Sequence, residues 1–193
     1  RKILRTAIAS AFFLTALGTA VQAENLKVFV GGAMTEPLRD VAADFTKRTG
    51  NAVDIVSDTT GALQKRLRAG DRADLVIVTS MAVESLTKEK LLEEAHADLA
   101  RALIGVGIHK GAKAPDISTP EKFKAALLGA KSIVYVDPKA GGTSGIYFEG
   151  LLKKLGIADA IKPKTVYRFQ GSQVADAVAK GDAELGITFG AEM

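Results

Sequence analysis

The chain contains no cysteine, and His96 and His109 are its only histidines. The lack of cysteine excludes disulfide frameworks, thiolate nucleophiles and cysteine-bound zinc. The two histidines do not have the spacing of a metal-binding pair, so the sequence predicts no metal site. No dinucleotide cofactor is predicted either, because Gly31-Gly32 lacks the G-x-G-x-x-G spacing and Gly105-Val106-Gly107 opens no predicted helix.

Residues 1–23 have the pattern of a secretory signal peptide. Three basic residues precede an apolar run over positions 7–20, and Val21-Gln22-Ala23 provides the small residues of a cleavage site. The alternative, a membrane anchor, is disfavoured because a spanning helix needs about 20 apolar residues. We therefore expect export to the periplasm, with cleavage after Ala23.

In the remainder of the chain the net positive charge is small and aromatic residues are few. The formal net charge is +4, and residues 1–23 carry three basic and no acidic side chains, which leaves +1 after cleavage. Aromatic residues make up 6% of the sequence and are not interleaved with lysine or arginine. Because proteins that bind nucleic acids present basic stripes, no nucleic-acid partner is predicted.

The first part of the exported chain alternates between strand and helix patterns. Apolar runs over Leu26–Val30, Ala52–Ser57 and Asp74–Thr79 are separated by helical spacings that end at Gly50 and near Gly70. The run Asp74–Thr79 is continuous, as in a strand that is buried on both faces. This order of elements predicts a parallel sheet covered by helices.

A second unit has a similar order of elements. Its predicted strands and helices are Ser132–Val136, about Ser144 to Leu155, Thr165–Phe169, Ser172–Lys180 and Leu185–Phe189. We predict an α/β fold of two lobes, residues 24–104 and 105–193, joined near Leu103–Lys110. Ligands of open α/β sheets bind outside the carboxyl ends of the strands, so a cleft between the lobes is expected.

The turn Asp137–Gly145 is the strongest indication of a binding site. It links the strand Ser132–Val136 to a helix through Gly141-Gly142-Thr143-Ser144. Free N–H groups and the helix dipole attract anions to such a helix start. The alternative is an ordinary turn in which a serine caps the helix.

Three other strand-to-helix junctions have the same small or hydroxyl-bearing character. They are Gly31–Pro37, with Thr35 as an expected cap, Ser57–Gly61, which includes Thr59 and Thr60, and Gln170–Val174. Four such junctions, two in each lobe, are better explained by a shared anion than by capping alone. Five basic residues could add charge to the site, although a solvated surface position is favoured for each one: Lys65, Arg66, Arg68, Lys139 and Arg168. Arg168 is the strongest candidate of these, because it lies at a predicted strand end just before the junction Gln170–Val174.

Five segments of the chain follow the pattern of a known family: Val28–Leu38, Thr60–Leu63, Gly70–Leu75, Asp137–Tyr147 and Gly181–Ile187. Through them the sequence resembles the periplasmic molybdate-binding proteins of ABC transporters over nearly all of residues 26–190. It implies a two-lobed type II binding protein that closes on an oxyanion, delivers it to a membrane permease and performs no catalysis. It also implies ligand contacts near Ala33, Thr60, Ser144, Val174 and Phe189, to which the junctions themselves add Thr59 and Thr143.

Two positions differ from the family pattern. Ala33 stands where the family has a serine, and Phe189 stands where it has a tyrosine, so a tetrahedral oxyanion would lose two hydroxyl donors. The turn Gly141–Ser144 also resembles that of relatives that take larger anions. The alternative function is therefore a (tri)carboxylate-binding protein or an exported aconitate isomerase. The latter needs a base, for which Asp58 and Glu36 lie near the junctions.

The chain stops after Phe189–Met193. The resemblance implies that type II binding proteins return to the first lobe after this strand. We therefore expect the first lobe to be C-terminally truncated and to expose apolar surface.

Overall fold

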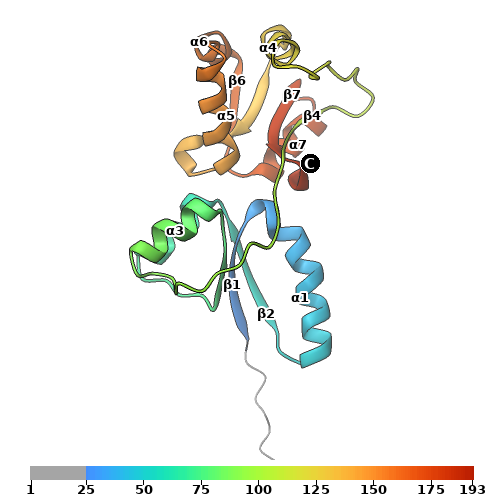
Figure 1. Cartoon of the computed structure of the whole chain (residues 1–193). Helices are drawn as coiled ribbons and strands as arrows, with labels where there is room; N and C mark the ends of the chain where they lie inside the picture. Colours follow the sequence, from blue (N-terminus) through green and yellow to red (C-terminus); the bar gives the residue numbers. More distant parts are fainter. Residues whose placement is uncertain (1–24) are drawn as a thin grey trace, which may run out of the picture.

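The computed structural model describes residues 25–193, which form two β-sheets with helices packed on them (Figure 1). The expected signal peptide, residues 1–23, lies outside the described residues. Among residues 25–193, no helix combines the length and the apolar character needed to cross a bilayer. The predicted α/β class is confirmed.

The first sheet has three parallel strands in the order β2-β1-β3, formed by β1 (Leu26–Gly31), β2 (Val53–Asp58) and β3 (Leu75–Ile77). The 3₁₀ turn η1 (Gly32–Met34) and helix α1 (Thr35–Thr49) follow β1. Helices α2 (Thr60–Arg68) and α3 (Ser80–Lys88) follow β2 and β3. The predicted β-α-β-α-β order is therefore present.

The prediction that Asp74–Thr79 is buried on both faces is wrong. β3 covers only three of these residues, and the side chain of Leu75 is 50% exposed. β3 lies at the edge of the sheet, where it pairs with β1 alone. An apolar run predicts a strand, but it does not show whether a second strand lies beside it.

The second sheet has four strands in the order β4-β7-β5-β6. β5 (Ile133–Val136) is parallel to both β6 (Thr165–Arg168) and β7 (Leu185–Phe189), whereas β4 (Ile104–Ile108) runs antiparallel to β7. The helices of this part are α4 (Pro120–Gly129), α5 (Thr143–Lys154), α6 (Ala158–Ile161) and α7 (Gly171–Ala179). Three 3₁₀ turns complete it: η2 (Pro138–Ala140), η3 (Lys162–Lys164) and η4 (Gly190–Glu192).

Helices α3 and α4 were not predicted. The signal for α4 is nevertheless present, because Thr119 caps the helix by accepting a hydrogen bond from the Lys122 N–H, and Pro120 occupies the first turn. α3 places Ala82 and Leu86 four residues apart on its buried face. Both helices are short, so their apolar periodicity spans little more than two turns.

Each sheet has its own apolar core. In the first, Phe29 of β1 packs against Leu63, Leu67 and Leu86 of the helices. In the second, the largest cluster is centred on Tyr135 and Phe148, whose rings meet edge to face with centroids 4.9 Å apart. Separate cores allow each sheet to hold its own loops rigidly.

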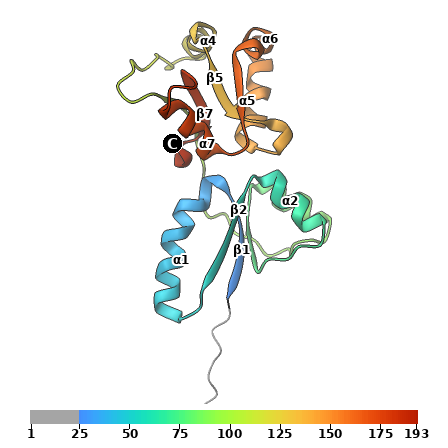
Figure 2. The same cartoon turned by 180° about the vertical axis from the view of Figure 1, so that it is seen from behind.

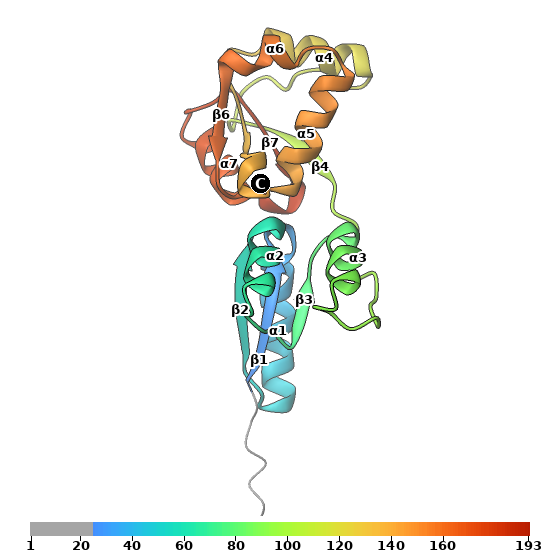
Figure 3. The same ribbon diagram turned by 90° about the vertical axis from the view of Figure 1, so that its left-hand side faces the viewer.

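The carboxyl ends of the parallel strands of the two sheets face each other, whereas β4 runs the opposite way. β1 and β2 point toward the second sheet, and β5 ends near the start of α5, close to the first sheet (Figure 1). The side view in Figure 3 places the start of α2 directly beneath the second sheet, and Figure 2 shows the same arrangement from behind. This opposition brings the loops of both sheets to one cleft.

Candidate functional site

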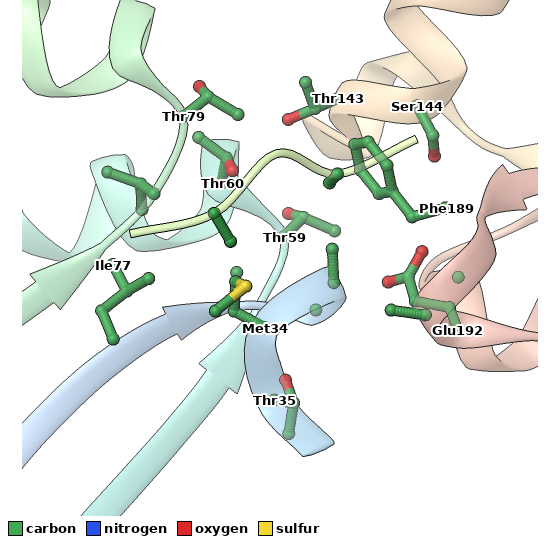
Figure 4. Close-up of a pocket in the computed structure, with 18 of the residues that line it drawn as sticks. Met34, Thr35, Thr59, Thr60, Ile77, Thr79, Thr143, Ser144, Phe189 and Glu192 are labelled. Atoms are coloured by element: carbon green, nitrogen blue, oxygen red, sulfur yellow. The ribbon is translucent and has the colours of Figure 1, made fainter. Parts of the chain in front are cut away.

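One cleft lies between the two sheets, lined by η1, the starts of α1, α2 and α5, and the ends of β3 and β7 (Figure 4). Its volume is about 2200 Å³. Small-molecule sites usually enclose 300–1,000 Å³, so a small ligand fills only part of this space. The polar part is the region where the helix starts of the two sheets face each other.

Six of the seven predicted ligand residues line this cleft. Thr143 and Ser144 lie on one side near Phe189, and Thr59 and Thr60 lie opposite them (Figure 4), while Ala33 is on η1. The exception is Val174, whose side chain is fully buried in the core between α7 and the second sheet. Only the main chain of Val174 is therefore available for a ligand contact.

The start of α5 has no side-chain cap. Its N-cap is Gly142, and no side chain accepts a hydrogen bond from the first turn. Ser144 is 2% exposed and lies inside the helix, with its Oγ 3.5 Å from Thr188 Oγ1. The alternative in which a serine caps this helix is therefore wrong. The free N–H groups of the first turn keep their capacity to bind an anion.

The start of α2 is capped and contacts the second sheet. Thr59 Oγ1 accepts a hydrogen bond from the Ala62 N–H at 3.1 Å and donates one to the carbonyl oxygen of Ala140 at 2.8 Å. The Gly61 N–H donates to the carbonyl oxygen of Gly141 at 3.1 Å. The turn Asp137–Gly145 is thus fastened to the first sheet, and these bonds fix how far apart the two halves of the cleft lie.

Thr35 does not cap α1, contrary to the prediction. The N-cap is Met34, and Thr35 is already the first helical residue. Its Oγ1 lies 2.6 Å from the Oγ of Ser57, so this hydroxyl links the start of α1 to the end of β2 instead. The start of α7 likewise has no side-chain cap at Gln170.

The basic residues considered as charge partners do not line the cleft. Arg66, Arg68 and Arg168 form surface ion pairs with Asp71, Glu89 and Asp182. Lys65 and Lys139 are exposed. The basic side chains that do line the cleft, Arg39, Arg72, Lys90 and Arg101, are exposed. At the helix starts themselves, the groups that can bind an anion are N–H groups and hydroxyls, whose oriented dipoles offset the cost of desolvation.

Asp58 and Glu36, the two carboxylates considered as bases, both line the cleft. Asp58 Oδ1 accepts a hydrogen bond from the Thr59 N–H at 2.7 Å, and Glu36 is exposed and pairs with Arg39. Within residues 25–193, no group of three or more histidine, aspartate or glutamate side chains is arranged to hold a metal ion.

Glu192 is the site residue that the sequence did not predict. It lies on η4, three residues after Phe189, and its carboxylate points into the cleft beside Phe189 (Figure 4). Burial raises the pKa of this carboxyl above its ordinary value, against the opposing effect of the hydrogen bond from Thr188. The sequence did not indicate this residue because a carboxylate repels an anion and is therefore not expected in an anion-binding site.

Opposed helix starts over a cleft between two α/β sheets form an arrangement that suits a small anion. The chain belongs to the bacterial extracellular solute-binding protein family, whose model matches residues 26–193. Its similarity to solved type II periplasmic binding proteins shows the same fold. The periplasmic molybdate-binding protein of Azotobacter vinelandii superposes with a TM-score of 0.67 at 23% identity, covering 87% of this chain and 72% of that one.

Curated relatives have two different functions. The chain is 29% identical to an aconitate isomerase of Pseudomonas sp over 179 residues, which is 90% of this chain and 67% of the relative. It is 27% identical to the molybdate-binding protein ModA of Escherichia coli over 206 aligned positions, covering 100% of this chain and 76% of the relative. The tungstate ABC transporter protein of Geobacter sulfurreducens shares the fold, with a TM-score of 0.66 at 20% identity, covering 88% of this chain and 73% of that one.

Proposed function

We propose that the protein is the periplasmic binding protein of an ABC transporter, exported by residues 1–23, that binds a molybdate-like oxyanion or a related small anion and delivers it to a permease. The lobes are residues 24–104 and 105–193, with the second beginning within β4. The observation that carries the proposal is the uncapped start of α5 facing the hydroxyls of α2 across one cleft. Membership of the solute-binding family supports it.

The proposed ligand contacts are the hydroxyls of Thr60, Thr143 and Ser144, together with main-chain N–H groups near Ala33 and Val174 and the ring of Phe189. Thr59 donates its hydroxyl proton to Ala140, so its proposed role is to hold the cleft in shape beside the ligand. Hydroxyls and N–H groups bind an anion without a positive charge because their dipoles are held in place by the helices. Binding without chemical conversion is the activity we propose.

The second candidate is a (tri)carboxylate-binding protein or an aconitate isomerase. One observation favours it over a site for a tetrahedral oxyanion. Ala33 and Phe189 line the cleft without offering hydroxyls. The similarity to the aconitate isomerase of Pseudomonas sp supports the same reading.

Calorimetric titration with molybdate, sulfate, citrate and aconitate separates these candidates. Tight molybdate binding excludes the proposal of a carboxylate-binding protein. Carboxylate binding with no molybdate binding excludes the proposal of an oxyanion-binding protein. Incubation with cis-aconitate, followed by proton NMR, tests for isomerisation. Appearance of trans-aconitate above the uncatalysed rate would overturn the proposal that the protein only binds.

Replacement of Ser144 by alanine is expected to weaken binding of the preferred anion. A hydrogen bond to a charged group contributes about 1.5–3 kcal/mol, which corresponds to a loss of about tenfold to a hundredfold in affinity. The matched control is Ser118→Ala, an exposed serine outside the cleft that bonds to Asp116. Equal affinities of the Ser144→Ala and Ser118→Ala proteins would remove Ser144 from the site.

Restoring the missing hydroxyls is expected to favour a tetrahedral oxyanion. Ala33→Ser and Phe189→Tyr each add a donor to the cleft, and each should raise the affinity for molybdate about tenfold relative to citrate. Phe169→Tyr adds the same hydroxyl at an exposed position outside the cleft and should change nothing. If the ratio of molybdate to citrate affinity stays constant in both cleft variants, these positions do not set the choice of anion.

A further inference from the structure

Glu192 places a carboxylate of the protein in the region proposed for the anion. Its η4 turn packs against η1, β4 and α7. Side-chain atoms of Glu192 lie so close to the main chain of Gly32 and Gly171 that a Cβ on either glycine would collide with the carboxylate. Gly171 is the first residue of α7, whose N-terminus has no side-chain cap. The carboxylate thus lies against a helix start that would otherwise be open to a ligand anion.

Glu192 has no counter-charge. None of the ion pairs found among residues 25–193 includes it. The elements packed against it present no charged side chains there: η1 is Gly-Ala-Met, β4 is Ile-Gly-Val-Gly-Ile, and α7 begins Gly-Ser-Gln-Val. Asp176, further along α7, is exposed, and on α1 Glu36 is exposed and already paired with Arg39.

A chain of hydroxyls joins Glu192 to the predicted ligand residue Ser144. Thr188 Oγ1 donates to Glu192 Oε2 at 2.6 Å, and the Ser144 Oγ lies 3.5 Å from the same Thr188 oxygen. While Glu192 is ionised, the Thr188 hydroxyl must donate to it and can only accept from Ser144. Any hydrogen bond between the two hydroxyls then has Ser144 as its donor, and while it forms the Ser144 proton points away from a bound anion.

Protonation of Glu192 reverses this chain. The neutral carboxyl can donate to Thr188, whose hydroxyl is then free to donate to Ser144, and the Ser144 proton becomes available to the ligand. The same step removes a negative charge that would repel the anion across a partly desolvated space. Both effects favour the protonated form of Glu192 in the complex.

We propose that Glu192 couples anion binding to the uptake of one proton, and so acts as a specificity-determining residue of the cleft. This inference rests on the proposed function. A bound anion raises the pKa of Glu192, because it adds a like charge nearby. Between the pKa of the free protein and that of the complex, affinity therefore falls as pH rises. A dianion is penalised more than a monoanion, because it repels the ionised carboxylate more strongly.

The test is calorimetric titration of the exported protein with sulfate and molybdate between about pH 5 and pH 8, in buffers of different ionisation enthalpy. We expect uptake of about one proton per anion within the window between the two pKa values, where affinity falls about tenfold per pH unit. Glu192→Gln keeps the size of the side chain and should bind with no proton uptake and no dependence on pH. The matched control is Glu121→Gln, which removes an equal charge in the first turn of α4, outside the cleft, and should keep the pH dependence.

Three results are decisive. Anion binding with no proton uptake in the unmodified protein, or an unchanged pH dependence in Glu192→Gln, overturns the inference and leaves the proposed function standing. Absence of binding to sulfate, molybdate, citrate and aconitate at every pH overturns both. If Glu192→Gln does not fold, carbon NMR of the labelled Glu192 carboxyl in the unmodified protein replaces this test. The inference requires the pKa of Glu192 to rise when the anion is added, and an unchanged pKa overturns it.

Discussion

Replacement of Gly61 by alanine is expected to weaken anion binding about tenfold, which corresponds to about 1.4 kcal/mol. A Cβ on Gly61 would lie 2.6 Å from the Cα of Gly141 and 3.2 Å from its carbonyl oxygen. Both are main-chain atoms of the turn that carries the start of α5, so they cannot rotate away. The two halves of the cleft must move apart, so the binding groups on its two sides no longer reach the same ligand at their proper distances.

The Gly61→Ala protein should still unfold at nearly the same temperature, because Gly61 meets no atom of its own sheet within the colliding distance. Gly129→Ala is the matched control, since a Cβ on that glycine of α4 meets nothing within 4 Å. Titration of both variants with the preferred anion measures the effect. Binding of Gly61→Ala at the affinity of the control would show that the contact between Gly61 and Gly141 does not set the width of the cleft.

Replacement of Gly145 by alanine is expected to destabilise the protein strongly. A Cβ at this position would overlap the carbonyl oxygen of Val136, at the end of β5. Overpacking in a core costs about 3 kcal/mol, and a loss of that size lowers the Tm of a domain of 150–250 residues by about 6–12 °C. Since Gly145 directly follows Ser144 in the buried first turn of α5, the variant should also lose anion affinity.

The same helix supplies the control for this prediction. A Cβ on Gly150 meets nothing within 4 Å, and this residue lies in the interior of α5. Gly150→Ala should therefore stabilise the protein by about 0.5–1 kcal/mol through the higher helix propensity of alanine. Thermal unfolding of the two variants, followed by circular dichroism, compares them directly. Similar Tm values would mean that α5 can shift away from β5 without cost.

Much of the fold could be predicted from local patterns. The apolar runs of β1, β2 and β5 and the helical spacing of α1 are all visible in the sequence, because each depends on residues near one another in the chain. The edge position of β3 and the antiparallel direction of β4 were not visible. Both depend on which strand lies alongside, and strand pairing joins residues as far apart as Ile104 and Phe189.

The candidate site could be predicted only in part, and here too the predictable part is the local one. Hydroxyls and glycines at helix starts mark Thr59, Thr60, Thr143 and Ser144, and the strand end marks Phe189. The sequence did not distinguish capping hydroxyls from free ones. In the structure Thr59 caps its helix and Ser144 does not, because the main-chain angles of each turn decide which oxygen reaches an N–H.

The sequence by itself determined an α/β protein with glycine- and hydroxyl-rich helix starts and without cysteine or any basic stripe, since these properties follow from composition and short-range order. It also predicted that four of those helix starts share one cleft, and only the tertiary structure decided which of their groups are free to bind a ligand. It alone placed Glu192 against the start of α7 and joined it through Thr188 to Ser144. The charge and hydrogen bonding of a site depend on groups brought together by folding, and their distances in space are not encoded in their spacing along the chain.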